Sequence, residues 1–402
     1  GFVDSRVGAG TFVSARGVRA ISTTAVQRRP SPLQARPIWN SVALSTAFER
    51  PARFDFRTGL PDASLFPHKA WRRLIGRELR GDAVEAGVYG RPAGLPALRS
   101  AIARHIGISR GVQVSADDIT ITNGTQQALD IVARVLLAPG DLVAVEDPGY
   151  TPARFLFESL GARLVGVPVD REGLTVDALP RRARLVYVTP SHQYPLGVPM
   201  SLSRRMALLA WAERPDAAIV EDDYDSEFRF VGHPTEPLQT LDTAGRVIYV
   251  GSFSKTMLPT LRIGFLVVPP SIRAATHKAK YVTDWHTAAP IQAAMARFID
   301  AGGFARHVRR MNNVYRARHA LITDALTRDF ARHLELLPST NGLHVAALAR
   351  TASARRIDAV ARQAAEAGVA HALDPVVGAE SLGDCRRVLG VPAHPDLEGR
   401  EA

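Results

Sequence analysis

The sequence contains one cysteine, Cys385, among its 402 residues. A single cysteine cannot close an internal disulfide, and without a cysteine cluster we expect no structural zinc site or other metal centre. No run of about eighteen apolar residues is present, and the N-terminus lacks the charged, apolar and small-residue succession of a signal peptide. We therefore expect a cytoplasmic protein without a membrane-spanning segment.

Lysine is also scarce, because only four of the 50 lysines and arginines are lysine: Lys69, Lys255, Lys278 and Lys280. Arginine keeps its proton and cannot supply the free amine that an imine requires. A lysine that forms a covalent imine is therefore one that arginine cannot replace, although chance retention explains some of the four.

The rest of the composition, with 46% hydrophobic and 22% charged residues, is that of a globular chain long enough for a large core and more than one domain. The formal net charge of +11 suits a protein that meets anions, either nucleic acid or phosphorylated ligands.

The first fifty residues differ from the remainder. Residues 1–14 hold two short apolar segments around a glycine turn, which predict a β-hairpin. Residues 15–53 are basic and rich in turn-forming residues, with five arginines and no acidic residue between positions 14 and 48. We interpret residues 15–53 as a flexible linker that either lies along DNA phosphates or is a solvated tether.

Residues 54–402 predict an α/β domain. Short, β-rich apolar runs alternate with helical patterns, which argues for a mainly parallel sheet covered by helices on both sides. After Pro290 an arginine-rich helical sequence continues to about Phe330, and a smaller mixed α/β section follows. The predicted strands are residues 119–122, 142–145, 185–188, 218–220, 247–250 and 264–268, and the predicted helices include residues 126–138 and 202–213.

The strongest chemical signal is Ser252-Phe253-Ser254-Lys255-Thr256, with Arg262 seven residues beyond Lys255. A cofactor that is both an aldehyde and a phosphate needs an amine for the aldehyde, and hydroxyls plus a guanidinium for the dianion. The string follows a predicted strand, and α/β proteins bind ligands at the carboxyl ends of strands. Taken alone, it is equally compatible with a solvated loop.

A second string, Glu221-Asp222-Asp223-Tyr224, ends the predicted strand 218–220. Side chains two residues apart on a strand face the same way, so Asp222 and Tyr224 could approach one flat ligand. A buried carboxylate beside a pyridine nitrogen would keep that nitrogen protonated, and the phenol could bond to a ring oxygen. The alternative is a helix N-cap or a solvated turn.

A third string, Asn123-Gly124-Thr125-Gln126-Gln127, follows the predicted strand 119–122 and opens a helix. Strand, glycine turn and helix N-terminus together favour a phosphate, although a plain turn would look the same. Tyr150, after another strand, would either stack on a planar ring or only pack. Because all four loops follow strands, they point to one site.

These strings resemble fold-type I aminotransferases, which depend on pyridoxal 5'-phosphate, and more closely the MocR-type regulators of the GntR superfamily. The likeness covers nearly the whole chain. It implies a mainly parallel seven-stranded sheet in a large domain of about residues 91–290, and a smaller α/β domain made from the flanking segments. The matching strings, in order and spacing, are residues 123–130, 146–150, 189–193, 221–228 and 252–256.

The resemblance also concerns the ends of the chain. It implies that residues 1–14 are the final wing of a winged helix-turn-helix, most of which lies outside these 402 residues. We therefore expect no specific recognition of a DNA operator by this chain alone. The end of the chain is shorter than the family's closing helix, which would weaken the small domain.

The resemblance gives each matching residue a role. Lys255 would form the Schiff base, Asp222 would pair with the pyridine nitrogen, and Tyr224 with the ring oxygen. Tyr89 matches a tyrosine that reaches the phosphate of the partner subunit, which implies a homodimer with shared sites. Tyr150 would stack on the ring, Thr125, Ser252, Ser254 and Arg262 would hold the phosphate, and Gly124 and Gln126 would also line the cofactor site.

The chain departs from the aminotransferase pattern at one contact. Tyr194-Pro195 stands where aminotransferases carry an asparagine-proline pair for the ring oxygen, so either His192 or Tyr194 substitutes or the contact is absent. The arginine for the substrate carboxylate should lie late in the chain. Arg387 is the first candidate and Arg386 the second, and the alternative for both is a solvated basic pair.

Two functions stay open at this point. The first is the effector-sensing domain of a transcriptional regulator, which binds an amino compound or pyridoxal phosphate through an aldimine and passes a change of shape through the linker. The second is a catalytically active aminotransferase in which Lys255 also moves a proton. A mere dimerisation scaffold ranks last, because a decayed site would not keep these polar residues correctly spaced.

Overall fold

The computed structural model describes residues 3–8, 10–13, 33–44, 54–80, 87–230, 236–337, 339, 341–371 and 389–390. The chain divides into two compact units, residues 1–42 and 43–402. In the first unit, strands β1 (Val3–Arg6) and β2 (Gly10–Val13) pair antiparallel, which confirms the predicted hairpin. Its identity as a wing stays a prediction. The described part of the predicted linker contains a short 3-10 helix, η2 (Pro37–Asn40).

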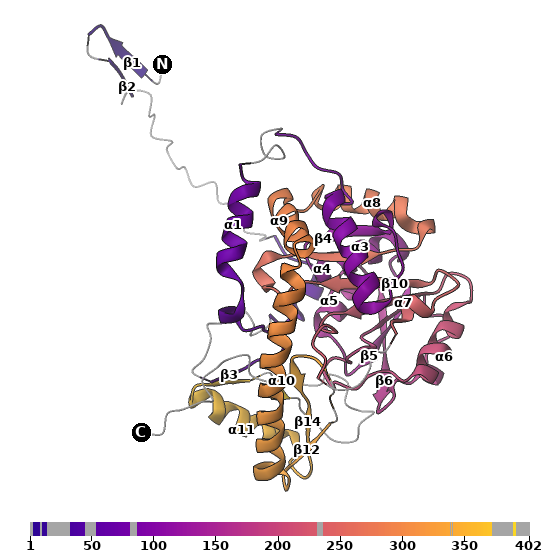
Figure 1. The fold of residues 1–402 in the computed structure, drawn as a ribbon. Coiled ribbons are helices and arrows are strands. Elements are labelled where there is room, and N and C mark those ends of the chain that lie inside the picture. The colour runs from indigo at the N-terminus through magenta and orange to yellow at the C-terminus, as the bar shows by residue number, and fades with distance from the viewer. Residues whose placement is uncertain are drawn as a thin grey trace, which may run out of the picture. The chain divides into compact units, whose positions relative to one another are not determined.

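The centre of the second unit is an eight-stranded sheet, of which Figure 1 labels β4, β10, β5 and β6. The order of its strands is β4-β11-β10-β9-β8-β5-β6-β7. Strands β10, β9, β8, β5 and β6 pair in parallel, whereas β11 runs antiparallel between β10 and β4. The predicted mainly parallel sheet is therefore confirmed, and β7 adds a two-residue edge to the seven strands expected. The strands are β4 (Ile119–Thr122), β5 (Leu142–Asp147), β6 (Arg163–Asp170), β7 (Gly173–Leu174), β8 (Leu185–Val188), β9 (Ala218–Asp223), β10 (Val247–Ser252) and β11 (Gly264–Val267).

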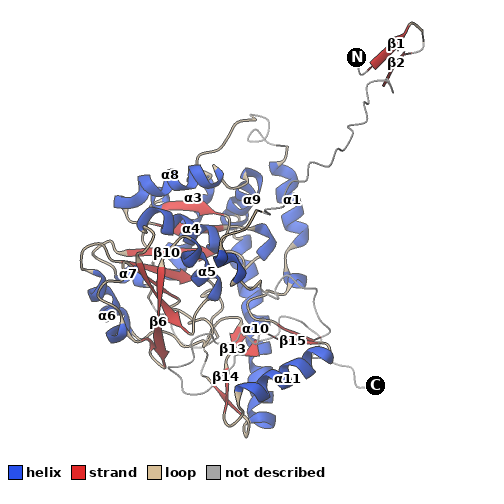
Figure 2. Ribbon diagram, turned by 180° about the vertical axis from the view of Figure 1, so that it is seen from behind, coloured by secondary structure: helices blue, strands red, loops and turns tan. Residues whose placement is uncertain are grey.

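Helices cover both faces of this sheet, as Figure 2 shows. Alternate side chains of one strand enter opposite cores: on β5, Val143 and Val145 pack in one cluster and Ala144 in the other. The first face is covered by α4 (Thr125–Leu136), α5 (Thr151–Ser159) and α8 (Pro270–Asp284). The second is covered by α1 (His68–Glu78), α3 (Pro96–Arg110), α6 (Leu202–Ala212) and α9 (Ala289–Asp300).

The arginine-rich sequence after Pro290 forms two helices, α9 and α10 (Gly303–Phe330), separated at Gly302, whose φ is +68°. Beyond α10, the smaller α/β section is described in part, and β3 pairs in parallel with β15. This pairing joins a segment before the large sheet to one far beyond it. The elements are β3 (Phe54–Phe56), β12 (Leu334–Leu336), β13 (His344–Val345), β14 (Ala347–Ala349), α11 (Ala354–Glu366), β15 (Val369–His371) and β16 (Leu389–Gly390).

Short helical turns complete the described elements: η4 (Ala63–Leu65), η5 (Ala116–Asp118), η6 (Val176–Ala178), α7 (Leu238–Leu241) and η7 (Pro259–Leu261). Within the described ranges, no helix combines the length and the apolar character that a membrane crossing requires.

Candidate functional site

The predicted site residues follow strands that end at the same edge of the sheet. Strands β5, β8, β9 and β10 are mutually parallel, and β4 shares their direction because β11 runs antiparallel to both β10 and β4. Their carboxyl ends therefore lie along one edge, where ligands of α/β proteins bind. The loops beyond them carry Gly124, Tyr150, His192, Tyr224 and Lys255.

Lys255 lies in the loop after β10, and its Nζ donates a 2.6 Å hydrogen bond to the carbonyl of Gly59. Burial lowers the pKa of Lys255, while the nearby carboxylates of Asp225 and Asp222 oppose this shift. A lowered pKa increases the fraction of free amine, the form that attacks an aldehyde. Gly59 has a φ of +72°, a backbone conformation that favours glycine, and a Cβ there would lie 2.6 Å from Nζ and displace the amine.

Asp222 lies at the end of β9 and is 4% exposed. Its Oδ2 accepts a 2.8 Å hydrogen bond from the Tyr187 hydroxyl, whereas Oδ1 has no hydrogen-bond partner in the described part of the chain. Burial raises the pKa of Asp222 to about 7, although the bond from Tyr187 lowers it. A buried oxygen without a donor is costly. A protonated pyridine nitrogen would supply that donor, so this carboxylate fits pyridoxal phosphate.

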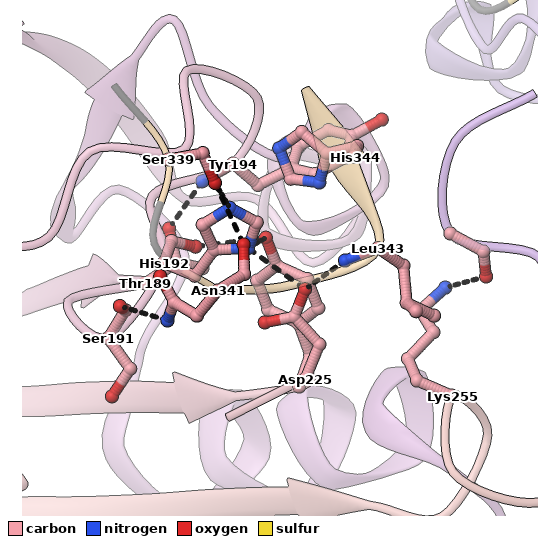
Figure 3. A network of polar contacts seen from close by, with 12 residues as sticks. Thr189, Ser191, His192, Tyr194, Asp225, Lys255, Ser339, Asn341, Leu343 and His344 are labelled. Carbon is pink, nitrogen blue, oxygen red and sulfur yellow. Dashed lines mark hydrogen bonds and ion pairs between the residues drawn. The ribbon is translucent and has the colours of Figure 1, made fainter. Parts of the chain in front are cut away.

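Tyr224 contacts His192, a labelled residue of the polar network in Figure 3. The Tyr224 hydroxyl donates a 2.9 Å hydrogen bond to the His192 carbonyl and lies 3.2 Å from His192 Nδ1. This Nδ1 also lies 2.9 Å from Oδ2 of Asp225. Burial raises the pKa of the Tyr224 phenol well above its ordinary value, so the phenol keeps its proton and can donate it.

The same network includes the one group of potential metal ligands found among the described residues, His192, Asp225 and His344, whose ligand atoms lie within 4.8 Å of one another. Each of the three already has a polar partner. His192 and Asp225 contact each other, and Nε2 of His344 lies 3.1 Å from the Pro195 carbonyl. The two imidazole rings overlap, with centroids 4.3 Å apart and planes at 34°. A ring nitrogen that faces a carboxylate or carbonyl oxygen carries the proton, so we assign Nδ1 of His192 and Nε2 of His344 to hydrogen bonding.

The predicted phosphate loop meets Arg262 directly. The Arg262 guanidinium donates a 2.7 Å hydrogen bond from Nη2 to the Asn123 carbonyl, and a Cβ on Gly124 would lie 2.7 Å from the same nitrogen. Gly124 has a φ of +81° and precedes α4, which begins at Thr125. Free backbone amides at a helix N-terminus and a guanidinium together bind an anion. The oxygen Oε1 of Gln126 has no partner among the described residues.

The serines of the lysine loop adjoin this anion site. The Oγ of Ser252 accepts a 3.1 Å hydrogen bond from the backbone N–H of Ser254. Ser252 pairs with Gly264 on β11, and a Cβ on Gly264 would lie 2.9 Å from the Cα of Gly124. Residues of three loops are therefore brought together, and their binding of a phosphate stays a prediction.

Two predicted aromatic residues lie in different surroundings. The ring of Tyr150 meets the ring of Tyr194 edge-on, with centroids 5.7 Å apart, and the Tyr194 hydroxyl lies 3.4 Å from Oγ1 of Thr58. Tyr89 is 75% exposed, and its ring packs against Trp285 at 4.3 Å. An exposed tyrosine is available to a second subunit, whose presence stays a prediction. Arg386 and Arg387 lie outside the described residues.

Sequence reasoning missed several residues of the site. Gly59 and Tyr187 come from segments distant in sequence, and neither has a motif around it. Arg110 and Asp223 form a buried ion pair with a 2.8 Å bond from Nε to Oδ2, which fixes the residue between Asp222 and Tyr224. Glu221, Asp222 and Asp223 follow one another at the end of β9, and successive side chains of a strand face opposite ways. The sequence therefore indicated that a carboxylate next to Asp222 faces away from the ligand and needs a partner of its own.

Comparison with known proteins matches most of the chain to one family. Residues 60–371 match the aminotransferase class I and II family. The chain is 39% identical over 349 residues to the probable rhizopine catabolism regulatory protein MocR of Rhizobium meliloti, covering 86% of this chain and 71% of that protein. It is 39% identical to the HTH-type transcriptional regulator YhdI of Bacillus subtilis, covering 72% of this chain.

Among solved structures, the kynurenine aminotransferase of Pyrococcus horikoshii, determined in complex with PMP, is similar with a TM-score of 0.80 and 29% identity. The likeness covers 90% of this chain and 93% of that one. The fold and its site thus define an aminotransferase-like protein of fold type I. Within this class the chain belongs to the MocR-type regulators of the GntR superfamily, which carry an aminotransferase-like domain. It spans 62% of the length of YhdI.

Proposed function

We propose that residues 54–402 bind pyridoxal 5'-phosphate at Lys255 and act as the effector-sensing domain of a MocR-type transcriptional regulator. One observation carries the proposal: the half-buried amine of Lys255 and the unpartnered Oδ1 of Asp222 belong to the ends of the adjacent, parallel strands β10 and β9, where each group shifts the pKa of the other. An amine and a carboxylate at the same edge of the sheet match the aldehyde and the ring nitrogen of this cofactor.

Different residues of the site would bind different parts of the cofactor. Asp222 would bind the ring nitrogen and Tyr224 the ring oxygen, while Tyr150 would cover a ring face. Bound pyridoxal phosphate supplies an aldehyde carbon that amines attach to and a ring that withdraws electrons. Residues of three loops would bind the phosphate: Gly124, Thr125, Ser252, Ser254 and Arg262.

Sensing requires that an amino compound replace Lys255 on the aldehyde carbon. The displaced amine would have Gly59 as its acceptor, because Nζ of Lys255 lies 2.6 Å from the Gly59 carbonyl. Gly59 lies three residues beyond β3, which pairs with β15 of the smaller section. A change at Lys255 would therefore reach that section directly. The basic segment 15–53 would carry it to a DNA-binding part of the regulator, with DNA as partner of the whole protein.

The proposal is tested by adding pyridoxal phosphate to the purified chain and reducing with borohydride. We expect one equivalent to become fixed, with peptide mapping locating it at Lys255, and we expect Lys255→Ala to retain none. Lys278→Ala, a change of an exposed lysine, provides the control. Cofactor trapped equally by the Lys255→Ala chain would refute the assigned site.

The second candidate is an active aminotransferase, and the 29% identity to a kynurenine aminotransferase over 90% of the chain favours it. In that case Lys255, with its lowered pKa, would also accept and return a proton at the substrate carbon. Steady-state assays with amino donors and keto acids distinguish the two functions. Repeated turnover at ordinary enzymatic rates would contradict a purely sensing role, whereas binding of an amino compound without turnover supports it.

A further inference from the structure

Lys280, another of the four lysines, is completely buried on α8 although no role described above involves it. Each of its three N–H groups has an acceptor: Oε1 of Gln127 at 2.8 Å, Oδ2 of Asp284 at 2.7 Å and Oγ1 of Thr287 at 3.1 Å. An ammonium matches three converging acceptors around one point, which the larger planar guanidinium does not. This geometry explains why lysine persists here in a chain that otherwise uses arginine.

Two of these acceptors also bind Asn123, the residue before Gly124. The side-chain nitrogen of Asn123 donates a 2.6 Å bond to Oδ2 of Asp284, and its backbone N–H donates a 2.8 Å bond to Oε1 of Gln127. The Asn123 carbonyl accepts from Arg262 at 2.7 Å. Asn123 is thus held on three sides, and Lys280 orients the partners on two of them.

We propose that Lys280 is a positioning residue for the phosphate of pyridoxal 5'-phosphate, which fixes Asn123 from behind so that Gly124 and Thr125 present their backbone amides beside Arg262. The proposal rests on the proposed function, because it presupposes the cofactor in this loop. The effect is positional rather than a long-range attraction. Asp284, 2.7 Å from the ammonium, cancels most of its charge as seen from the anion site.

A comparison of pyridoxal phosphate with pyridoxal, which lacks the phosphate, tests this role. Both compounds are titrated into the wild-type chain, Lys280→Met and Lys278→Met, the last being an exposed position on the same helix. We expect Lys280→Met to weaken pyridoxal phosphate on the order of tenfold and to leave pyridoxal unchanged, since one charged hydrogen-bond network is lost. Lys278→Met should match the wild type.

The results that would contradict the role of Lys280 differ from those that would contradict the proposed function. Equal weakening of both compounds would mean a general loosening of the fold. An affinity of Lys280→Met for pyridoxal phosphate equal to that of the wild type would mean no role in the loop. Either result overturns this proposal and leaves the proposed function standing. A wild-type chain that binds neither compound would overturn the proposed function together with it.

Two further variants keep the test decisive should Lys280→Met fold poorly. Thr287→Val removes one acceptor without leaving a buried charge unpaired, and should give a smaller loss with the same phosphate dependence. Asn123→Ala should reproduce the loss, and adding Lys280→Met to it should weaken binding no further, because coupled residues are not additive. Fully additive losses would contradict an action through Asn123.

Discussion

The hydroxyl of Tyr187 donates a 2.8 Å hydrogen bond to Oδ2 of Asp222 across the boundary between β8 and β9. The parallel register pairs Tyr187 with Val220, so the phenol extends along the sheet face to the carboxylate two residues further on. Both side chains are buried. This bond fixes the carboxylate plane and leaves Oδ1 for a ligand, so Tyr187 determines where Asp222 presents its free oxygen.

We predict that Tyr187→Phe weakens pyridoxal phosphate binding about tenfold, because a hydrogen bond to a charged group contributes about 1.5–3 kcal/mol. Tyr249→Phe is the matched control, since Tyr249 is equally buried but donates to the adjacent Asp223. Titration of the cofactor and thermal unfolding measure the two effects. Both variants should lose stability, and only Tyr187→Phe should lose affinity. Equal affinities in the two variants would contradict this role of Tyr187.

The pKa of Asp222 predicts how the stability of the cofactor-free chain depends on pH. Burial raises this pKa from 3.8 to about 7 in the folded chain. A raised pKa means that the folded state holds the proton more tightly, so its contribution is complete below pH 4 and is lost as the pH rises to about 7. We expect the Asp222 contribution to the free energy of unfolding to fall by at most about 4 kcal/mol across this window.

Asp222→Asn isolates this contribution, because asparagine does not titrate. The difference in unfolding free energy between wild type and variant, measured by denaturation from pH 4 to pH 8, should change in favour of the variant as the pH rises. Glu221, whose burial also raises its pKa to about 7, gives a background common to both chains. The pKa of Glu146 is raised mainly by burial and in part by the Asp222 charge, so its share of the pH dependence belongs to the difference that is measured. A pH-independent difference would show that Asp222 is already ionised at acidic pH.

The strand-end loops could be predicted from the sequence because each strand is a short apolar run with polar residues at its end. The predicted bounds of β4 and β8 agree with the structure, and both strands are buried throughout. Strand β6 was not predicted, since Gly166 and Pro168 interrupt it and only two of its eight residues are buried. The break between α9 and α10 was also missed, although Gly302 and Gly303 mark it.

Contacts behind the site could not be predicted for a different reason. Lys280 and Gln127 are separated by 153 residues, and their bond depends on how α8 packs against α4. The Tyr187 bond depends on which strand neighbours β8 and in which register. A sequence motif predicts the residues that contact a ligand. The residues that hold them in position are determined by tertiary packing, which a single sequence does not specify.

Gly59 provides a third prediction, on the placement of the Lys255 amine. Gly59→Ala introduces a Cβ 2.6 Å from Nζ at a φ of +72°. We expect a backbone cost of about 1–2 kcal/mol and, in addition, slower borohydride-trapped attachment of pyridoxal phosphate, because the amine must move. Gly245→Ala is the control, since its φ of +65° carries the same strain while the nearest atom is 3.8 Å away. Similar attachment rates in both variants would refute the steric argument.

Tyr89 gives a prediction about the assembly, because it is 75% exposed and is expected to reach the phosphate site of a partner subunit. Tyr89→Ala should weaken pyridoxal phosphate in a homodimer, and Lys255→Ala should abolish its covalent attachment. In a hybrid dimer of the two variants, one site combines Lys255 of the first subunit with Tyr89 of the second. Since that site has every group, the hybrid should recover wild-type affinity in half of its sites after denaturation and refolding of a mixture.

The control for this experiment is the mixture of wild-type chain with Lys255→Ala, which sets the binding expected from one intact site per hybrid. Tyr281, 50% exposed on α8 with its ring centroid 5.4 Å from that of Trp285, tests whether any aromatic loss in this region has the same effect. Tyr281→Ala should not be rescued by the Lys255→Ala subunit, because its weakening, if any, follows from packing within its own chain. Rescue of both tyrosine variants, or of neither, would mean that Tyr89 does not act across the subunit boundary.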